Sequence, residues 1–436
     1  MVYQKGTTED MEKIVLKNGL TVALEKLDFV RSAAIHVFVG CGNSNEDEQN
    51  VGMSHFIEHM VFKGTQTQSS RDILQKTDLM GGGINAFTAK EHTCFYARTL
   101  DYHVPKMLDI ICDMICYPLL SEQDIEVEKG VVLEEIRMYE DTPEELCIDK
   151  LNEVCWEKSH LAYNILGTRE TVNNFKSEQL REFLKKYYVP ERTVISVCGS
   201  FDRREVLAVI EKYFSQQPNS KNPIHIKKPV FSGGISLLDR PTEQTHVSFC
   251  FEGDSITAED RYAALIFSTI AGGSQSSRLY LRIREELGLA YNVFSYNSNY
   301  RNCGSFSVSA ALAPENQHKF LQESLEILGA MRRDITDDEI YRTKEQYKSS
   351  LVMSTESVVG ISASMGRQLL YNGEYVDVNG IIDKIDSVTK EEILRVSRKT
   401  TDPKKIALSV VGTPLKEDRY KEIIENYCLL CEKMVY

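Results

Sequence analysis

Residues 190–199, PERTVISVCG, recur 213 positions later as residues 403–412, PKKIALSVVG. In both copies a proline and a glycine bracket a short apolar run, which is typical of a buried strand between two turns. The same offset relates Gly40 to Gly253, and each of these glycines follows another predicted strand. A single offset that holds along the chain indicates two copies of one structural unit.

Each copy is predicted to begin with strands and to continue with helices, which favours the α+β class. Asn18-Gly19 separates two β-patterned segments and is a strong signal for a tight hairpin. Helices are expected at 104–116 and 177–187, and the apolar positions of the first recur at helical spacing. We therefore expect two homologous α/β-sandwich domains, each with a mainly antiparallel sheet covered by helices.

The offset also suggests where one copy ends and the next begins. A polar stretch between the copies reads as a connection. The expected division is a first domain at 1–215, a linker at 216–231 and a second domain at 232–436.

Composition excludes several classes of protein. The net charge of −13 argues against nucleic-acid binding, which calls for a basic surface, and 42% hydrophobic residues suffice for sizeable cores. No apolar run approaches the length of a membrane span.

Eleven cysteines without framework spacing suggest free thiols in a reducing compartment. Because residues 1–11 do not resemble a signal or transit peptide, a cytoplasmic protein is expected.

The chemistry is concentrated in residues 55–59, HFIEH. On a helix, residues four apart lie one above the other, so His55 and His59 can hold one Zn²⁺. Glu58 then lies beside the metal, where its carboxylate can take a proton from water. The order of the motif is the reverse of His-Glu-x-x-His and defines the inverted zincins.

The third ligand should be a carboxylate, since two imidazoles and one carboxylate leave a coordination position open for water. The acidic stretch 126–137 reads as a helix in which Glu128 and Glu135 lie two turns apart on one face. The pattern alone does not distinguish Glu135 from Glu134.

Taken together, these motifs resemble the pitrilysin/insulinase family of zinc peptidases, in particular the branch of ~50 kDa chains that includes mitochondrial processing peptidase and its bacterial relatives. The resemblance covers nearly the whole chain. It is carried by HFIEH with Glu135 76 residues after His59, by the segments 85–93, 167–172 and 188–190, and by 278–291 in the second copy.

The resemblance implies one Zn²⁺ per chain, held by His55, His59 and Glu135, with Glu128 supporting the site and Glu58 as the general base. In the second copy the motif positions are occupied by Ser268, Ala271 and Gly272, which cannot bind a metal in this way.

The family likeness also implies how a substrate is held. The residues expected to bind an extended peptide as an added strand are Ile84, Asn85, Ala86, Phe87 and Thr88. In the second copy Arg282, Arg284 and Tyr291 are expected to hold the substrate and to stabilise the developing oxyanion.

The expected function is zinc-dependent hydrolysis of extended peptides or unfolded segments inside an enclosed chamber formed by a homodimer. One alternative is a presequence-processing subunit that forms a heterodimer with an inactive homologue. Another is a non-catalytic structural subunit of the same family, against which the intact motif argues.

Overall fold

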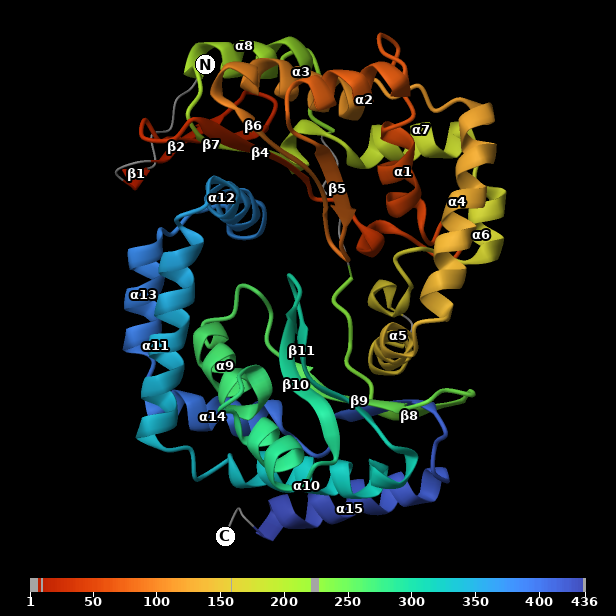
Figure 1. Ribbon diagram of the computed structural model, residues 1–436, viewed down its shortest axis with the longest axis vertical. Helices are drawn as coiled ribbons and strands as arrows, with labels where there is room; N and C mark the ends of the chain where they lie inside the picture. Colours follow the sequence, from red (N-terminus) through yellow and green to blue (C-terminus); the bar gives the residue numbers. More distant parts are fainter. Residues whose placement is uncertain (1–6, 9–10, 158, 221–226, 434–436) are drawn as a thin grey trace. The chain divides into compact units, whose positions relative to one another are not determined.

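The computed structural model describes residues 7–8, 11–157, 159–220 and 227–433 (Figure 1). These residues form two compact units, each built around one β-sheet. The first unit takes the described residues up to 136, with 163–220 and 351–378. The second takes 137–162, 227–350 and the described residues from 379 onward. Part of the predicted linker, 221–226, lies outside the described residues.

The sheet of the first unit has seven strands in the order β1-β2-β3-β7-β4-β6-β5. Their bounds are β1 Thr7–Thr8, β2 Met11–Val15, β3 Thr21–Lys26, β4 Ser32–Val39, β5 Ile84–Thr88, β6 Thr93–Leu100 and β7 Thr193–Gly199. Only β3 and β7 run parallel, and every other neighbouring pair is antiparallel. The predicted hairpin joins β2 to β3, and Gly19 has the positive φ of 91° that such a turn requires.

The sheet of the second unit has five strands in the order β10-β11-β9-β12-β8. Their bounds are β8 Gly234–Asp239, β9 Thr245–Gly253, β10 Ala290–Asn299, β11 Gly304–Leu312 and β12 Ile406–Gly412. β12 and β8 run parallel and the other pairs are antiparallel. The prediction of mainly antiparallel sheets is therefore confirmed for both units.

The offset of 213 residues also relates the first and last residues of corresponding strands and helices. Adding 213 to the bounds of β3 gives β8, and adding it to β7 gives β12. The helices agree in the same way, because α7 (Ser177–Tyr187) corresponds to α14 (Lys390–Thr400). Two copies of one α+β unit, predicted from a few matched positions, are thus present throughout the chain.

The helices of the first unit cover both faces of its sheet. α2 (Ser70–Leu79), α3 (Val104–Cys116) and α8 (Arg203–Phe214) lie on one side of the strands and α12 (Val358–Asn372) on the other (Figure 1). α12 comes from the second sequence copy. Its counterpart from the first copy, α5 (Pro143–Cys155), packs on β9 and β12 of the second unit. The two copies therefore exchange one helix each.

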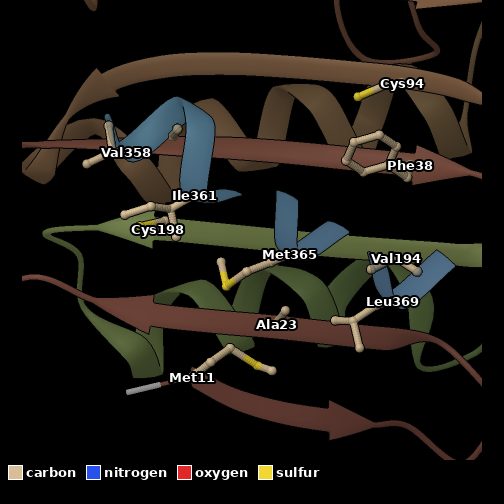
Figure 2. Close-up of a cluster of buried hydrophobic side chains, with 11 residues drawn as sticks. Met11, Ala23, Phe38, Cys94, Val194, Cys198, Val358, Ile361, Met365 and Leu369 are labelled. Atoms are coloured by element: carbon tan, nitrogen blue, oxygen red, sulfur yellow. The ribbon is translucent and has the colours of Figure 1, made fainter. Parts of the chain in front are cut away.

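The exchanged helix α12 packs deeply on the first sheet. Val358, Ile361, Met365 and Leu369 project from it onto buried strand residues such as Val194 (Figure 2). The backbone comes very close at Gly366, where an added Cβ would lie 2.5 Å from the Phe38 ring. Only glycine permits this approach, which fixes α12 to β4 and β7.

All eleven cysteines are free thiols. Among the helices of the described residues, none combines the length and the apolar character that a membrane crossing requires.

Candidate metal centre

The HFIEH motif lies on α1 (Met53–Val61), as its spacing predicts. One side of α1 is apolar and fully buried, with Phe56, Ile57, Met60 and Val61 in the core. His55, Glu58 and His59 share the remaining side, because positions 55, 58 and 59 fall within one sector of a helix of 3.6 residues per turn. The burial of the apolar side therefore fixes the direction of the three polar side chains.

A buried carboxylate caps the beginning of α1. Glu46 accepts hydrogen bonds from the backbone N–H of Gly52 at 2.8 Å and of Ser54 at 2.7 Å, and from Asn43 Nδ2 at 2.9 Å. The side chain of Glu46 is almost fully enclosed, and burial raises its pKa while these hydrogen bonds oppose the rise. A carboxylate at this position satisfies N–H groups that have no partner within the helix. Glu46 thereby anchors the first turn of the motif helix.

The third candidate ligand comes from α4 (Glu122–Glu140). The Oε2 atom of Glu135 lies 3.6 Å from Nε2 of His55 and 3.6 Å from Nε2 of His59. Among the described residues, these three side chains form the one cluster of possible metal ligands, with their ligand atoms within 4.8 Å of one another. Glu134 is not part of this cluster. The geometry thus favours Glu135 where the sequence pattern alone left both residues open.

The second carboxylate of α4 holds the orientation of His59. Oε1 of Glu128 lies 2.8 Å from Nδ1 of His59, and its Oε2 forms an ion pair with Lys63. With Nδ1 engaged by Glu128, Nε2 of His59 is directed to the Glu135 side. Carboxylates that orient a ligating imidazole in this way are common around zinc.

The two imidazoles differ in protonation tendency. Burial, reinforced by the nearby His59, lowers the pKa of His55 to about 3, so His55 is neutral as a metal ligand must be. For His59, burial lowers the pKa, but the hydrogen bond and the charge of Glu128 outweigh burial and raise it. Burial alone would raise the pKa of Glu128, but the hydrogen bonds and charges of His59 and Lys63 together outweigh burial and lower the pKa. Glu128 is therefore held as a carboxylate that can accept the Nδ1 proton of His59.

Glu58 is the one acidic residue on the motif helix. Thr88 Oγ1 donates a hydrogen bond of 2.6 Å to its Oε2. Burial raises the pKa of Glu58, and the hydrogen bond from Thr88 partly opposes this effect. A carboxylate with a raised pKa and one fixed oxygen is suited to accept and return a proton.

The donor set fits a zinc ion. Two imidazole nitrogens and one carboxylate oxygen are a known catalytic zinc set, which leaves a position for water or substrate. The Nδ1 atom of His55 is buried and has no hydrogen-bond partner among the described residues, so no second carboxylate orients this ring. The site is thus supported on the His59 side by Glu128 and on the α1 side by Glu46.

The predicted substrate strand lies at one end of its sheet. β5 pairs with β6 from Ile84 opposite Ala97 to Thr88 opposite Thr93, and β6 is its one neighbour in the described sheet. α1 packs directly against β5. Of the five residues predicted to bind substrate, Thr88 has its side chain engaged with Glu58, while Asn85 and Phe87 are exposed. Peptide binding at this edge stays a prediction.

The predicted second-copy residues belong to the second unit. Arg282 is engaged in two ion pairs, with Glu286 at 2.8 Å and Glu323 at 2.9 Å. Arg284 forms an ion pair with Glu285 at 3.5 Å and lies over the ring of Tyr291, 4.6 Å from its centroid. Tyr291 itself is 78% exposed. Tyr291 is therefore the most accessible of the three residues, and the roles of all three stay predictions.

Sequence reasoning missed the residues that support the site. Glu46 lies before the helix in an acidic segment, and an acid near a helix N-terminus was the available signal. Lys63 lies four residues after His59, and residues at this spacing are neighbours on a helix surface. Thr88 was predicted to contact substrate, and its side-chain contact with Glu58 could not be read from the sequence.

Both halves of the chain match models of known protein families. Residues 21–169 match the model described as insulinase, peptidase family M16, and residues 174–347 match the peptidase M16 inactive domain. The first match contains the metal-binding motif, and the second covers much of the copy that lacks it.

Curated relatives match over most of their length. The uncharacterized zinc protease YmxG of Bacillus subtilis is 37% identical over 390 residues, which is 89% of this chain and 95% of the relative. An uncharacterized zinc protease of Streptomyces coelicolor is 35% identical over 418 residues, covering 93% of this chain and 90% of the relative.

Solved structures agree with the fold. A protease from Helicobacter pylori superposes with a TM-score of 0.83 at 20% identity, covering 92% of this chain and 99% of that one. A peptidase M16 inactive domain from Pseudomonas fluorescens gives 0.86 at 18% identity, covering 93% and 98%.

Proposed function

Because the chain belongs to the insulinase family of peptidases, family M16, we propose that it is a zinc-dependent endopeptidase. The observation that carries this proposal is the convergence of His55, His59 and Glu135 beside Glu58. The names of the curated relatives, which describe zinc proteases, support zinc as the metal. One ion per chain is proposed, since the second copy has no equivalent ligands.

Each residue of the centre has a proposed part in peptide hydrolysis. When bound, zinc supplies a Lewis acid that polarises the scissile carbonyl and makes water easier to deprotonate. His55, His59 and Glu135 hold the ion, and Glu128 keeps Nε2 of His59 directed at it. Glu58 accepts a proton from the attacking water and passes it to the leaving amine.

Thr88 has a positioning role in this scheme. Its hydroxyl fixes one oxygen of Glu58, which leaves the other oxygen for proton transfer. Thr88 is also the last residue of β5, so the strand proposed to bind the peptide ends beside the base. This arrangement ties the placement of the substrate to the placement of the base.

The proposed substrate is an extended peptide or an unfolded segment. Such a peptide can pair with the outer edge of β5 through main-chain hydrogen bonds, which depend little on sequence. We propose that cleavage occurs in an enclosed chamber, so compact proteins are excluded. Cleavage rates of one polypeptide in its folded and destabilised forms test this point. Equal rates for both forms would contradict an enclosed chamber while leaving the peptidase assignment intact.

The peptidase assignment is tested by metal removal and return. A fluorogenic peptide should be cleaved by the purified chain, should resist cleavage after exhaustive chelation, and should be cleaved again after one equivalent of zinc is added. A chain that loads zinc but cleaves no peptide alone would favour the alternative of a processing subunit that needs a partner. A chain that binds no zinc would favour the non-catalytic alternative.

The proposed assembly is a homodimer in which each chain completes the site of the other. The first copy supplies the metal ligands, and the second supplies Arg282, Arg284 and Tyr291. Two-fold symmetric pairing is the commonest form of oligomer. Mixing Glu58→Gln chains with Tyr291→Phe chains tests the idea, because one site in the mixed dimer combines an intact base with an intact tyrosine. Partial recovery of activity is expected, and no recovery despite proven subunit exchange would contradict shared sites.

A further inference from the structure

A cavity in the first unit is lined by residues of α2, α3 and α8. These helices lie on one side of the sheet (Figure 1). The volume of the cavity is about 850 Å³, within the range of small-molecule sites. Apolar side chains from all three helices form much of its wall, among them Leu79, Ile110 and Val209. Leu79 is 83% exposed, so its apolar surface remains available to a ligand in this cavity.

Each of the three helices also contributes one lysine to this cavity: Lys76 from α2, Lys106 from α3 and Lys212 from α8. Lys212 is neutralised by Asp109, whose Oδ1 lies 2.6 Å from its Nζ. Lys76 donates to an uncharged amide oxygen, that of Gln68, at 2.6 Å. Lys106 forms no hydrogen bond or ion pair with any described residue.

The other carboxylate of the cavity is already satisfied. Asp113 is buried, and its Oδ2 accepts hydrogen bonds from Thr65, Thr67 and Gln68 at 2.6, 2.8 and 3.0 Å. Among the described residues, Lys106 therefore has no carboxylate partner, and Lys76 forms no direct ion pair, although the charge of Asp72 one helical turn before it acts on Lys76. The wall has three lysines and two aspartates, so it is slightly positive in a chain with a net charge of −13, which favours an anionic ligand.

The internal repeat provides a comparison for this cavity. A smaller cavity of about 530 Å³ lies between α10 (Gln317–Ala330) and α15 (Glu417–Lys433) of the second unit, the counterparts of α3 and α8. At its wall Gln322 and Glu326 stand where the first copy has Asp109 and Asp113, and Gln322 donates to Glu326 at 2.9 Å. Packing of this helix pair thus leaves a groove in both copies. What distinguishes the first groove is its size and its three lysines.

We propose that the groove between α2, α3 and α8 binds a free single-chain amphiphilic anion, of the fatty-acid type. Its acyl chain would cover Leu79, Ile110 and Val209, and its carboxylate would be held by Lys76 and Lys106. The walls are helices, whose main-chain groups are largely used internally, so recognition rests on apolar contact and on the lysines. An extended peptide would lack main-chain partners here. This proposal does not depend on the proposed peptidase activity.

Titration of the full chain with a fluorescent fatty acid, below its critical micelle concentration, tests the proposal. One saturable site per chain is expected, with displacement of the probe by palmitate and little displacement by hexadecanol, which has no charge. Lys106→Glu should weaken binding by about tenfold or more, because it replaces a charge-assisted contact with repulsion. Val209→Trp, which fills the groove, should abolish binding.

Lys319→Glu is the matched control, because Lys319 stands 213 residues after Lys106 and is likewise exposed. This variant should bind the probe as the wild-type chain does, and unchanged melting temperatures would show that all variants fold. The proposal fails if no saturable site is found, or if Lys106→Glu and Lys319→Glu bind equally. It also fails if the chain binds only to anionic phospholipid vesicles, or if an acidic peptide displaces the probe more strongly than palmitate does.

Discussion

Glu46→Gln is expected to loosen α1, the helix that carries the proposed ligands His55 and His59. The substitution keeps the size of the side chain but replaces one acceptor oxygen with an NH₂ group. The carboxylate of Glu46 accepts from Gly52 N–H, Ser54 N–H and Asn43 Nδ2, so at least one of these donors would then face another donor. A buried N–H that loses its acceptor costs about 1–3 kcal/mol. Loss of the negative charge at the helix start adds roughly 0.3–1 kcal/mol. The expected loss of unfolding free energy is therefore about 1.3–4 kcal/mol.

Urea unfolding of the chelator-treated chain measures this loss, because zinc would otherwise mask it by stabilising the folded state. Asp202→Asn is the matched control. Asp202 caps α8 in the same way, with its Oδ1 accepting from Arg204 N–H at 2.8 Å and Glu205 N–H at 3.1 Å, but it is exposed. Water can replace the lost interaction there, so a cost below about 1 kcal/mol is expected.

Zinc affinity provides a second readout for Glu46. Since Glu46 does not touch the ligands, its effect must pass through the position of α1. A zinc affinity that falls for Glu46→Gln and stays unchanged for Asp202→Asn would support this path. If the two substitutions cost the same unfolding free energy, the reasoning that a buried carboxylate anchors the motif helix would be refuted.

Three further predictions concern the exchanged helix, a buried imidazole and the support of the metal centre. Gly366→Ala should destabilise the chain by about 1–3 kcal/mol in thermal unfolding, because the added methyl would overlap the ring of Phe38. Gly130→Ala is the control: nothing lies within 4 Å of its added methyl, so this substitution should stabilise the chain slightly. His36 is buried in β4, and burial lowers its pKa to about 4, so it stays neutral in the folded chain while it gains a proton below about pH 6.5 in the unfolded chain. Its contribution to stability is thus lost as the pH falls from 6.5 toward 4, by about 2 kcal/mol at pH 5, and a variant without this imidazole should show a shallower decline of unfolding free energy in that window. Lys63→Met should weaken zinc binding about tenfold in competition with a chelator, because Glu128 loses the ion pair that holds it against the ligand imidazole, and unchanged affinity would contradict that role.

Much of the fold could be predicted from the sequence because the chain repeats itself. The bounds of α3 and α7 follow from helical spacing, and the hairpin follows from Asn18-Gly19. The exchange of α5 and α12 could not be predicted. An amphipathic helix shows which of its sides is buried but not which sheet buries it, and both sheets come from copies of one sequence pattern.

In the candidate site, too, the residues that are close together in the sequence could be predicted, and those brought together by packing could not. His55, Glu58 and His59 are local in sequence, so the helix period alone brings them together. Glu135 required either a family resemblance or the packing of α4, because Glu134 is chemically identical. The role of Glu46 could not be predicted because it depends on the path of the chain between residues 46 and 52. The chain turns back there, so that the carboxylate of Glu46 accepts hydrogen bonds from the first turn of the helix. Gly52, with a φ of 90°, makes this turn possible.

The central claim is that His55, His59 and Glu135 hold one zinc ion while Glu58 acts on the water. The most direct measurement is the zinc content of purified Glu58→Gln together with its rate of peptide cleavage in the same preparation. About one zinc per chain should remain, since the ligands are untouched, and the rate should fall by a factor on the order of 10² or more. A Glu58→Gln chain that keeps its zinc and cleaves at the wild-type rate would contradict the account.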